Sequence, residues 1–282
     1  RSRKIDQKVF EIFPFIHQVT DNDEAVYKAC KSVIEDYIDD NVKYLELRSA
    51  PKFNTKTGMS CGSYVAALIR AIEDASENGD IVVKLLLSID RTRSLELARE
   101  TINLALSNVN YVVGIDLSGD PRSDGRKFID LLNYIKRSSN LKIALHLAEV
   151  PNMNEEIEQF LELNLADRIG HGTFLHECSP KILEKIWRQK TPIEICLTSN
   201  VKCGTVKSYA NHHYDIWRHK NPIILCTDDK GVFATNLSQE YSIAAKCYDL
   251  SSKNVSALAQ NGFKYAFIDD NSKNLMLDKY FS

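Results

Sequence analysis

Seven apolar segments recur along the chain at nearly regular intervals. They occupy residues 42–47, 81–89, 111–117, 142–148, 167–170, 193–197 and 222–227, and most are rich in Val, Ile and Leu. Near-continuous apolar runs of this length are typical of strands in a parallel sheet that is buried on both faces. The expected strand ends, from residue 48 to residue 228, lie on average 30 residues apart. That spacing is close to the ~31 residues per unit of a (β/α)8 barrel.

The stretches between these segments have helical periodicity. Helices are predicted over residues 24–38, 62–76, 94–107, 125–137, 154–165 and 179–189, and Asp21 with Glu24 is predicted to form a capping box at the first. Residues 1–40 contain helical patterns and no strand pattern. We therefore expect an α/β fold, a TIM-type barrel in one domain over residues 1–282, which is incomplete at its N-terminus and lacks its first strand.

Composition excludes several classes of function. The 282 residues carry a formal net charge of −2, so a nucleic-acid-binding surface is not expected. No apolar run reaches the ~18 residues of a membrane helix, and no secretory signal is evident. The seven cysteines contain no CxxC pair, which favours reduced thiols, with Cys196 and Cys226 packed in strands. We expect a monomeric cytosolic protein with no membrane partner.

Polar side chains that bind metals or transfer protons follow three of the apolar segments. The runs LHLAE at 145–149, RIGHG at 168–172 and LCTDD at 225–229 present His146 and Glu149, His171, and then Asp228 and Asp229. In a (β/α)8 barrel the carboxyl ends of the strands form one mouth, where active sites lie. We therefore expect these side chains to meet there.

Each of these residues also has a purely structural interpretation. His146 could be a hydrogen-bonded core histidine beside a surface Glu149, His171 could be a turn residue, and Asp229 could cap a helix. The remaining histidines are weaker candidates: His212, His213 and His219 are expected to face solvent, His176 is expected to have no role, and His17 fits an ordinary helix face.

His146 and Asp228 together supply N and O ligands that suit Zn²⁺. Two protein ligands are too few, because catalytic zinc usually has three protein ligands and a water. The missing ligands are therefore expected on the missing first strand.

The motifs resemble those of the adenosine deaminase family. HLAE is similar to its H-x-x-E, RIGHG to its R-I-G-H-G, TDD to its T-D-D, and GIDLSGD to its G-x-D-L-x-G. The runs YLELRSAP, CLTSNVK and DDKGVFATNLSQEY resemble the adenosine deaminase-like branch, the N6-methyl-AMP deaminases. The resemblance extends from about residue 10 onward. It implies a barrel of the metal-dependent hydrolase kind.

The resemblance also implies roles for individual residues. His146 and Asp228 would bind one Zn²⁺ per complete chain, Glu149 would protonate purine N1, and His171 would orient and deprotonate the attacking water. Asp229 would bond to N7 and Gly119 would meet the N3 side of the base. The further positions that match nucleotide contacts are His17, Ser49, Ala50, Pro51, Lys52 and Asp90. The family's opening H-x-H strand is absent, because no H-x-H occurs in this sequence.

The resemblance implies zinc-dependent hydrolysis of N6-substituted AMP, such as N6-methyl-AMP, to IMP and an amine, in purine nucleotide metabolism. A phosphate on this small-molecule substrate would need cations at the pocket rim, for which Lys52, Arg91 and Arg93 are candidates. Two alternatives remain open: a deaminase that acts on adenosine nucleosides, and a catalytically inactive truncated isoform.

Overall fold

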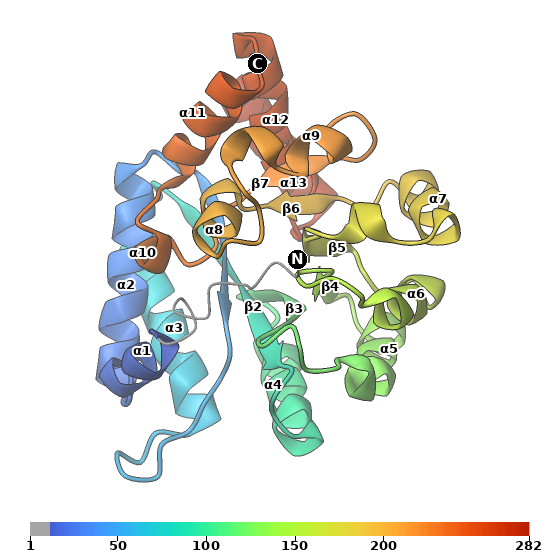
Figure 1. Cartoon of the computed structure of the whole chain (residues 1–282). Helices are drawn as coiled ribbons and strands as arrows, with labels where there is room; N and C mark the ends of the chain where they lie inside the picture. The colour runs from blue at the N-terminus through green and yellow to red at the C-terminus, as the bar shows by residue number, and fades with distance from the viewer. Residues whose placement is uncertain (1–11, 282) are drawn as a thin grey trace.

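The strands form a single parallel sheet that curls into an open barrel (Figure 1). In the computed structural model, which describes residues 12–281, each strand pairs with the next along the chain, in the order β1 to β7. The strands are β1 (Tyr44–Ser49), β2 (Val82–Asp90), β3 (Val112–Ser118), β4 (Lys142–Leu147), β5 (Arg168–His171), β6 (Ile193–Ile195) and β7 (Ile223–Leu225). All seven predicted strands are confirmed, and residues 1–11 lie outside the described part of the chain.

The helices alternate with the strands along the chain, and most of them cover the outer side of the sheet (Figure 1). They are α1 (Phe13–Val19), α2 (Asp23–Asp39), α3 (Cys61–Ala75), α4 (Leu95–Ser107), α5 (Ile129–Ser138), α6 (Asn154–Glu162), α7 (Pro180–Gln189), α8 (Leu197–Lys202), α9 (Tyr214–Trp217), α10 (Lys230–Phe233), α11 (Leu237–Cys247), α12 (Ser252–Lys264) and α13 (Asp270–Phe281). Between residues 12 and 281, no helix combines the length and the apolar character that crossing a membrane requires.

The first long helix begins differently from the prediction. Asn22 is the N-cap of α2, and its side chain accepts a hydrogen bond from the backbone N–H of Ala25 at 3.0 Å. The predicted capping box of Asp21 and Glu24 is therefore wrong. An asparagine satisfies a free N–H of the first turn as well as an aspartate does, and Asn22 is one residue closer to the helix.

The barrel is open between β1 and β7, the two edge strands of the sheet. All six residues of β1 are only partly buried, whereas most of β2 is fully buried. A cavity of about 1080 Å³ runs along this gap and is lined by Tyr44–Ser49 on one side and by residues 224–226 on the other. The gap lies where an eighth strand would close the barrel.

Charged side chains fill much of the barrel interior, whereas bulky aliphatic layers are the usual filling of this fold. Arg168 lies between Glu46 and Glu194, with its Nε 2.7 Å from Glu194 Oε1. Arg48 in turn pairs with Glu194 and lies 3.2 Å from Asp116 Oδ1. Opposite charges therefore alternate across the sheet, which compensates for much of the cost of burying them.

Replacing Arg168 with methionine is expected to destabilise the fold by about 3–5 kcal/mol, because it leaves two buried carboxylates without one of their cations. The Arg168 and Glu46 side chains are 6% and 8% exposed, so water cannot take over this role. Urea unfolding measures the change. Arg122→Met is the matched control, since Arg122 pairs with Asp120 at 63% side-chain exposure and its loss should change stability by less than ~1 kcal/mol. Equal losses in the two variants would contradict the importance of the buried network.

Candidate functional site

The carboxyl ends of β4 and β5 bring His146, Glu149 and His171 together. The strands pair in register, with Leu147 opposite His171 and His146 opposite Gly170. The His146 and His171 rings lie 5.1 Å apart between centroids. A Cβ at residue 170 would lie only 3.2 Å from His146 Cγ, so the glycine of RIGHG gives the His146 ring room against the neighbouring strand.

At the ends of three strands that carry candidate functional residues, one non-glycine residue has a left-handed backbone conformation. Ala148 has φ 55°, His171 has φ 57° and Asp228 has φ 58°. Such conformations cost free energy in residues with a Cβ, and they persist where the surrounding structure enforces them, often at functional sites. His171 and Asp228 are themselves candidate functional residues, and Ala148 directly precedes Glu149.

His171 faces two carboxylates across the mouth of the barrel. Its Nε2 lies 3.6 Å from Glu149 Oε2 and 3.7 Å from Asp228 Oδ2. Asp228 Oδ2 also accepts a hydrogen bond from Ser199 Oγ at 2.6 Å. Glu149 Oε1 is buried and has no hydrogen-bond partner among the described residues. The predicted proton-transfer residues therefore converge around one point.

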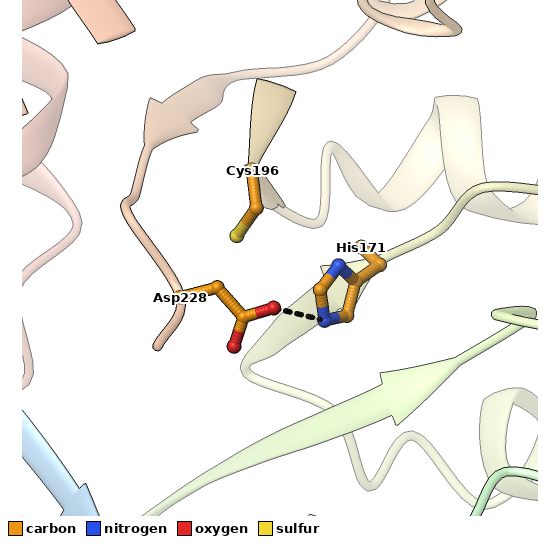
Figure 2. A group of neighbouring side chains, drawn as sticks. All are labelled: His171, Cys196 and Asp228. Carbon is orange, nitrogen blue, oxygen red and sulfur yellow. Dashed lines mark ion pairs between the residues drawn. The ribbon is translucent and has the colours of Figure 1, made fainter. Parts of the chain in front are cut away.

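The donor atoms around this point suit a metal ion. The ligand atoms of His171, Cys196 and Asp228 all lie within 4.8 Å of one another, and Figure 2 shows the three side chains pointing toward a shared space. Imidazole nitrogen, thiolate and carboxylate are the ligand types that zinc prefers. Cys196 lies just beyond β6, and like Cys226 it is a free thiol.

His146 is held by a buried carboxylate that the sequence analysis did not single out. Its Nδ1 lies 2.9 Å from Asp116 Oδ1, and Ser88 Oγ donates to Asp116 Oδ2 at 2.9 Å. Burial alone would lower the pKa of His146, but the Asp116 carboxylate outweighs it and raises the pKa to about 9. Because Asp116 holds Nδ1, Nε2 is the ring nitrogen that a metal could bind, and binding would release the Nε2 proton.

Asp229 lies beside Asp228 on the cavity wall, near the open side of the barrel. Asp229 is exposed as a residue, but desolvation of its carboxyl group in the cavity, together with the Asp228 carboxylate, raises its pKa to about 7. A carboxyl group with this pKa can donate a hydrogen bond as well as accept one.

A cationic group lies where the loop after β1 meets α1. Lys52 Nζ donates to Thr20 Oγ1 at 2.7 Å and lies 3.2 Å from His17 Nδ1. Burial, followed by repulsion from Lys52 and Arg93, lowers the pKa of His17. Burial is also the main cause of the lowered pKa of Lys52, to which Arg93 adds. Three basic side chains are therefore close enough to repel one another at this rim.

The other predicted substrate contacts follow β1, β2 and β3. Gly119 has φ 98°, and a Cβ there would lie 2.6 Å from Asp90 Oδ1, so only glycine fits beside this aspartate. Ser49 Oγ lies 2.7 Å from the Tyr64 hydroxyl. Of the next two positions, Ala50 is exposed and Pro51 is buried.

Two expectations about basic residues are wrong. Arg91 was a candidate for binding phosphate, but its side chain is 2% exposed and pairs with Glu156 at 2.5 Å. Its Nη2 donates to the backbone oxygen of His146 at 2.7 Å, so its charge serves the fold. His212 and His213 were expected to face solvent, yet they are only 2% and 3% exposed. His219 is exposed, as predicted.

A family model and individual known proteins both match this chain over most of its length. Residues 6–281 match the family model described as adenosine deaminase. A Danio rerio protein named N6-Methyl-AMP deaminase is 45% identical over 276 residues, which cover 94% of this chain and 78% of the relative.

Two solved Arabidopsis structures also match along nearly the whole chain. The apo structure of the N6-methyl-AMP deaminase from Arabidopsis thaliana is 38% identical, covers 99% of this chain and 85% of its own, and has a TM-score of 0.90. The structure of arabidopsis ADAL complexed with IMP is 39% identical, covers 96% of this chain and 82% of its own, and has a TM-score of 0.89.

Proposed function

Because this chain belongs to the adenosine deaminase family, we propose that it hydrolyses N6-methyl-AMP to IMP and methylamine, a step in purine nucleotide metabolism. The observation that carries this proposal is the meeting of Glu149, His171 and Asp228 at one mouth of the barrel. The names of the similar Danio rerio and Arabidopsis proteins, and the IMP in one Arabidopsis complex, support this choice of substrate.

The reaction adds water to C6 of the purine and breaks the C6–N6 bond, so that N6 leaves with its methyl group as methylamine and C6 keeps the oxygen of the water. Glu149 would donate a proton to N1, which prevents negative charge from accumulating on the ring. His171, 3.6 Å from Glu149, would orient the attacking water and accept its proton. Asp229 would bind N7, and Gly119 would allow the chain to approach the N3 side of the base.

His146 and Asp228 would hold a zinc ion. The ligand atoms of His171 and Cys196 cluster with that of Asp228, so these two side chains would lie beside the site. When bound, zinc would supply a water whose pKa is near 7, so that a nucleophile is available at neutral pH. The gap between β1 and β7 supports the expectation that further ligands come from an eighth strand lying between these edges.

The basic group of His17, Lys52 and Arg93 would bind the 5′-phosphate. These side chains repel one another, and a phosphate dianion between them would remove that repulsion. This favours a nucleotide over a nucleoside as the substrate. The direct test compares IMP and inosine formation from N6-methyl-AMP and from N6-methyladenosine. Faster turnover of the nucleoside would overturn this part of the proposal.

Replacing Lys52 with methionine should lower kcat/KM for N6-methyl-AMP by about 10–100-fold, because a hydrogen bond to a charged group contributes about 1.5–3 kcal/mol. Turnover of the nucleoside should change by less than about twofold, since it has no phosphate to lose contact with. Steady-state kinetics on both substrates measure the difference. Lys56→Met, an exposed lysine on the same loop, serves as the control. Equal losses of kcat/KM on the two substrates would show that Lys52 does not bind the phosphate.

A further inference from the structure

Two buried histidines, His212 and His213, are hydrogen-bonded to the segment that contains the candidate catalytic residue His171. His212 and His213 precede α9, and their rings stack with centroids 4.0 Å apart and an interplanar angle of 27°. Neither ring lines the cavity around which the functional side chains converge. Buried histidines need a reason, because each ring nitrogen must find a partner or lose hydration.

The partners of His212 determine which of its ring nitrogens carries the proton. Its Nδ1 accepts a hydrogen bond from the backbone N–H of Tyr214 at 3.0 Å. Its Nε2 must therefore be protonated, and it donates to Asn200 Oδ1 at 3.1 Å. The Asn200 amide in turn donates to Thr173 Oγ1 at 3.2 Å, two residues beyond His171. His212 is thus connected to the loop that follows β5.

His213 contacts the candidate catalytic residue directly. Its Nε2 lies 2.8 Å from the backbone oxygen of His171. A carbonyl oxygen can only accept, so His213 Nε2 carries a proton and donates it. Burial is the main cause of the lowered pKa of both histidines, to about 3 for His212. Both rings are therefore neutral, and neither adds a charge behind the site.

The carbonyl that His213 binds belongs to a strained part of the backbone. His171 has φ 57° and Gly172 has φ 59°, so two consecutive residues are left-handed at the end of β5. A residue with a Cβ adopts this conformation only when its surroundings enforce it. The direction of the peptide after His171 and the direction of its side chain depend on the same backbone torsions.

We propose that His213 is a positioning residue that fixes the left-handed backbone of His171 and so directs the His171 ring toward Glu149 and Asp228. His212 supports it by stacking and through the hydrogen bonds to Asn200 and Thr173. The expected effect on catalysis rests on the proposed function of His171. The expected effect on the His171 backbone does not. A displacement of about 1 Å in a reacting group can cost 10²-fold in rate, which sets the size of the expected effect.

The test compares two replacements of His213 that differ in one hydrogen-bond donor. Phenylalanine keeps a planar ring in the stack and removes the donor, whereas glutamine keeps an N–H that can reach the His171 carbonyl. The first measurement is hydrogen exchange of the Gly172 and Phe174 amides, which bond to Leu147 and Ala148 across the loop. Exchange at these amides should be about tenfold faster in His213→Phe and near the parent rate in His213→Gln. His219→Phe, an exposed histidine in the same segment, should leave exchange unchanged.

The second measurement is turnover of N6-methyl-AMP. In His213→Phe, kcat should fall about 10²-fold with KM within about threefold, and His213→Gln should recover most of the loss. A general loss of stability would lower activity in both variants without this rescue. Unchanged amide exchange in His213→Phe overturns the inference. Faster exchange with unchanged kcat leaves the positioning role in place and removes the catalytic role proposed for His171.

Discussion

Replacing Glu149 with glutamine is expected to lower kcat for deamination by about 10³-fold and to leave KM within a few-fold, because the variant loses a general acid. Glutamine has nearly the same size, so the turn through Ala148 should persist. It cannot give its proton to a ring nitrogen, however. Glu149 Oε1 is buried without a partner among the described residues, and Oε2 faces His171 at 3.6 Å. That arrangement leaves one carboxyl oxygen free for the substrate.

Release of IMP and methylamine measures this effect, together with the zinc content of the same preparations. The zinc content should match that of the parent, since the proposal gives Glu149 no role as a metal ligand. Glu155→Gln is the matched control, because the Glu155 side chain is 85% exposed and should leave the rate unchanged. If Glu149→Gln keeps more than about a tenth of the parent kcat, another group protonates the ring.

The architecture was predictable because the strand signal in this fold is strong. Parallel strands covered on both faces must be apolar along their whole length, and all seven apolar segments are strands in the structure. The residues at which the strands end were harder to predict. The apolar run at 193–197 was predicted as one strand, yet β6 stops at Ile195 and α8 begins at Leu197. Periodicity cannot separate a strand from a buried helix over so few residues.

The helices beyond β7 were not predicted. α11, α12 and α13 occupy most of residues 237–281, and few of their side chains are fully buried. α13 has almost no amphipathic pattern, whereas α12 does have a sequence signal, a capping box of Ser251 and Asn254, that the prediction did not use. α12 nevertheless packs against β7, and Asn261 donates to the backbone oxygen of Ile223 at 3.0 Å. This contact depends on tertiary structure, which a local pattern does not record.

The core of the candidate site was predictable, but its supporting residues were not. His146, Glu149, His171 and Asp228 were identified because they follow apolar strands, and the barrel brings such positions to one mouth. Asp116 was missed, although a signal was present: an aspartate inside the apolar run at 111–117 must find a buried partner. His212 and His213 were assigned to solvent because their neighbours are polar, and burial there results from packing between distant segments.

Asp228→Asn is expected to weaken zinc binding by more than about 100-fold, since even changes next to metal ligands cost 10–100-fold. It should also lower kcat by at least about 10³-fold, because a bound metal contributes several kcal/mol to catalysis. Asparagine keeps the shape of the side chain and tolerates φ 58° as well as aspartate does. Ser199 Oγ can still donate to the remaining carbonyl oxygen. The variant therefore tests the negative charge and leaves the backbone intact.

Comparing the zinc affinities of three Asp→Asn variants distinguishes a metal ligand from a residue that only supports a ligand. Asp116→Asn should weaken zinc affinity by about 10–100-fold, because Asp116 acts on the metal only through His146. Asp120→Asn, two residues beyond the end of β3 and paired with Arg122, should leave affinity unchanged. Competition with a chromophoric chelator measures all three affinities without substrate. If Asp228→Asn binds zinc as tightly as Asp120→Asn does, then Asp228 is not a ligand, and the neighbouring His171 and Cys196 become the candidates to test next.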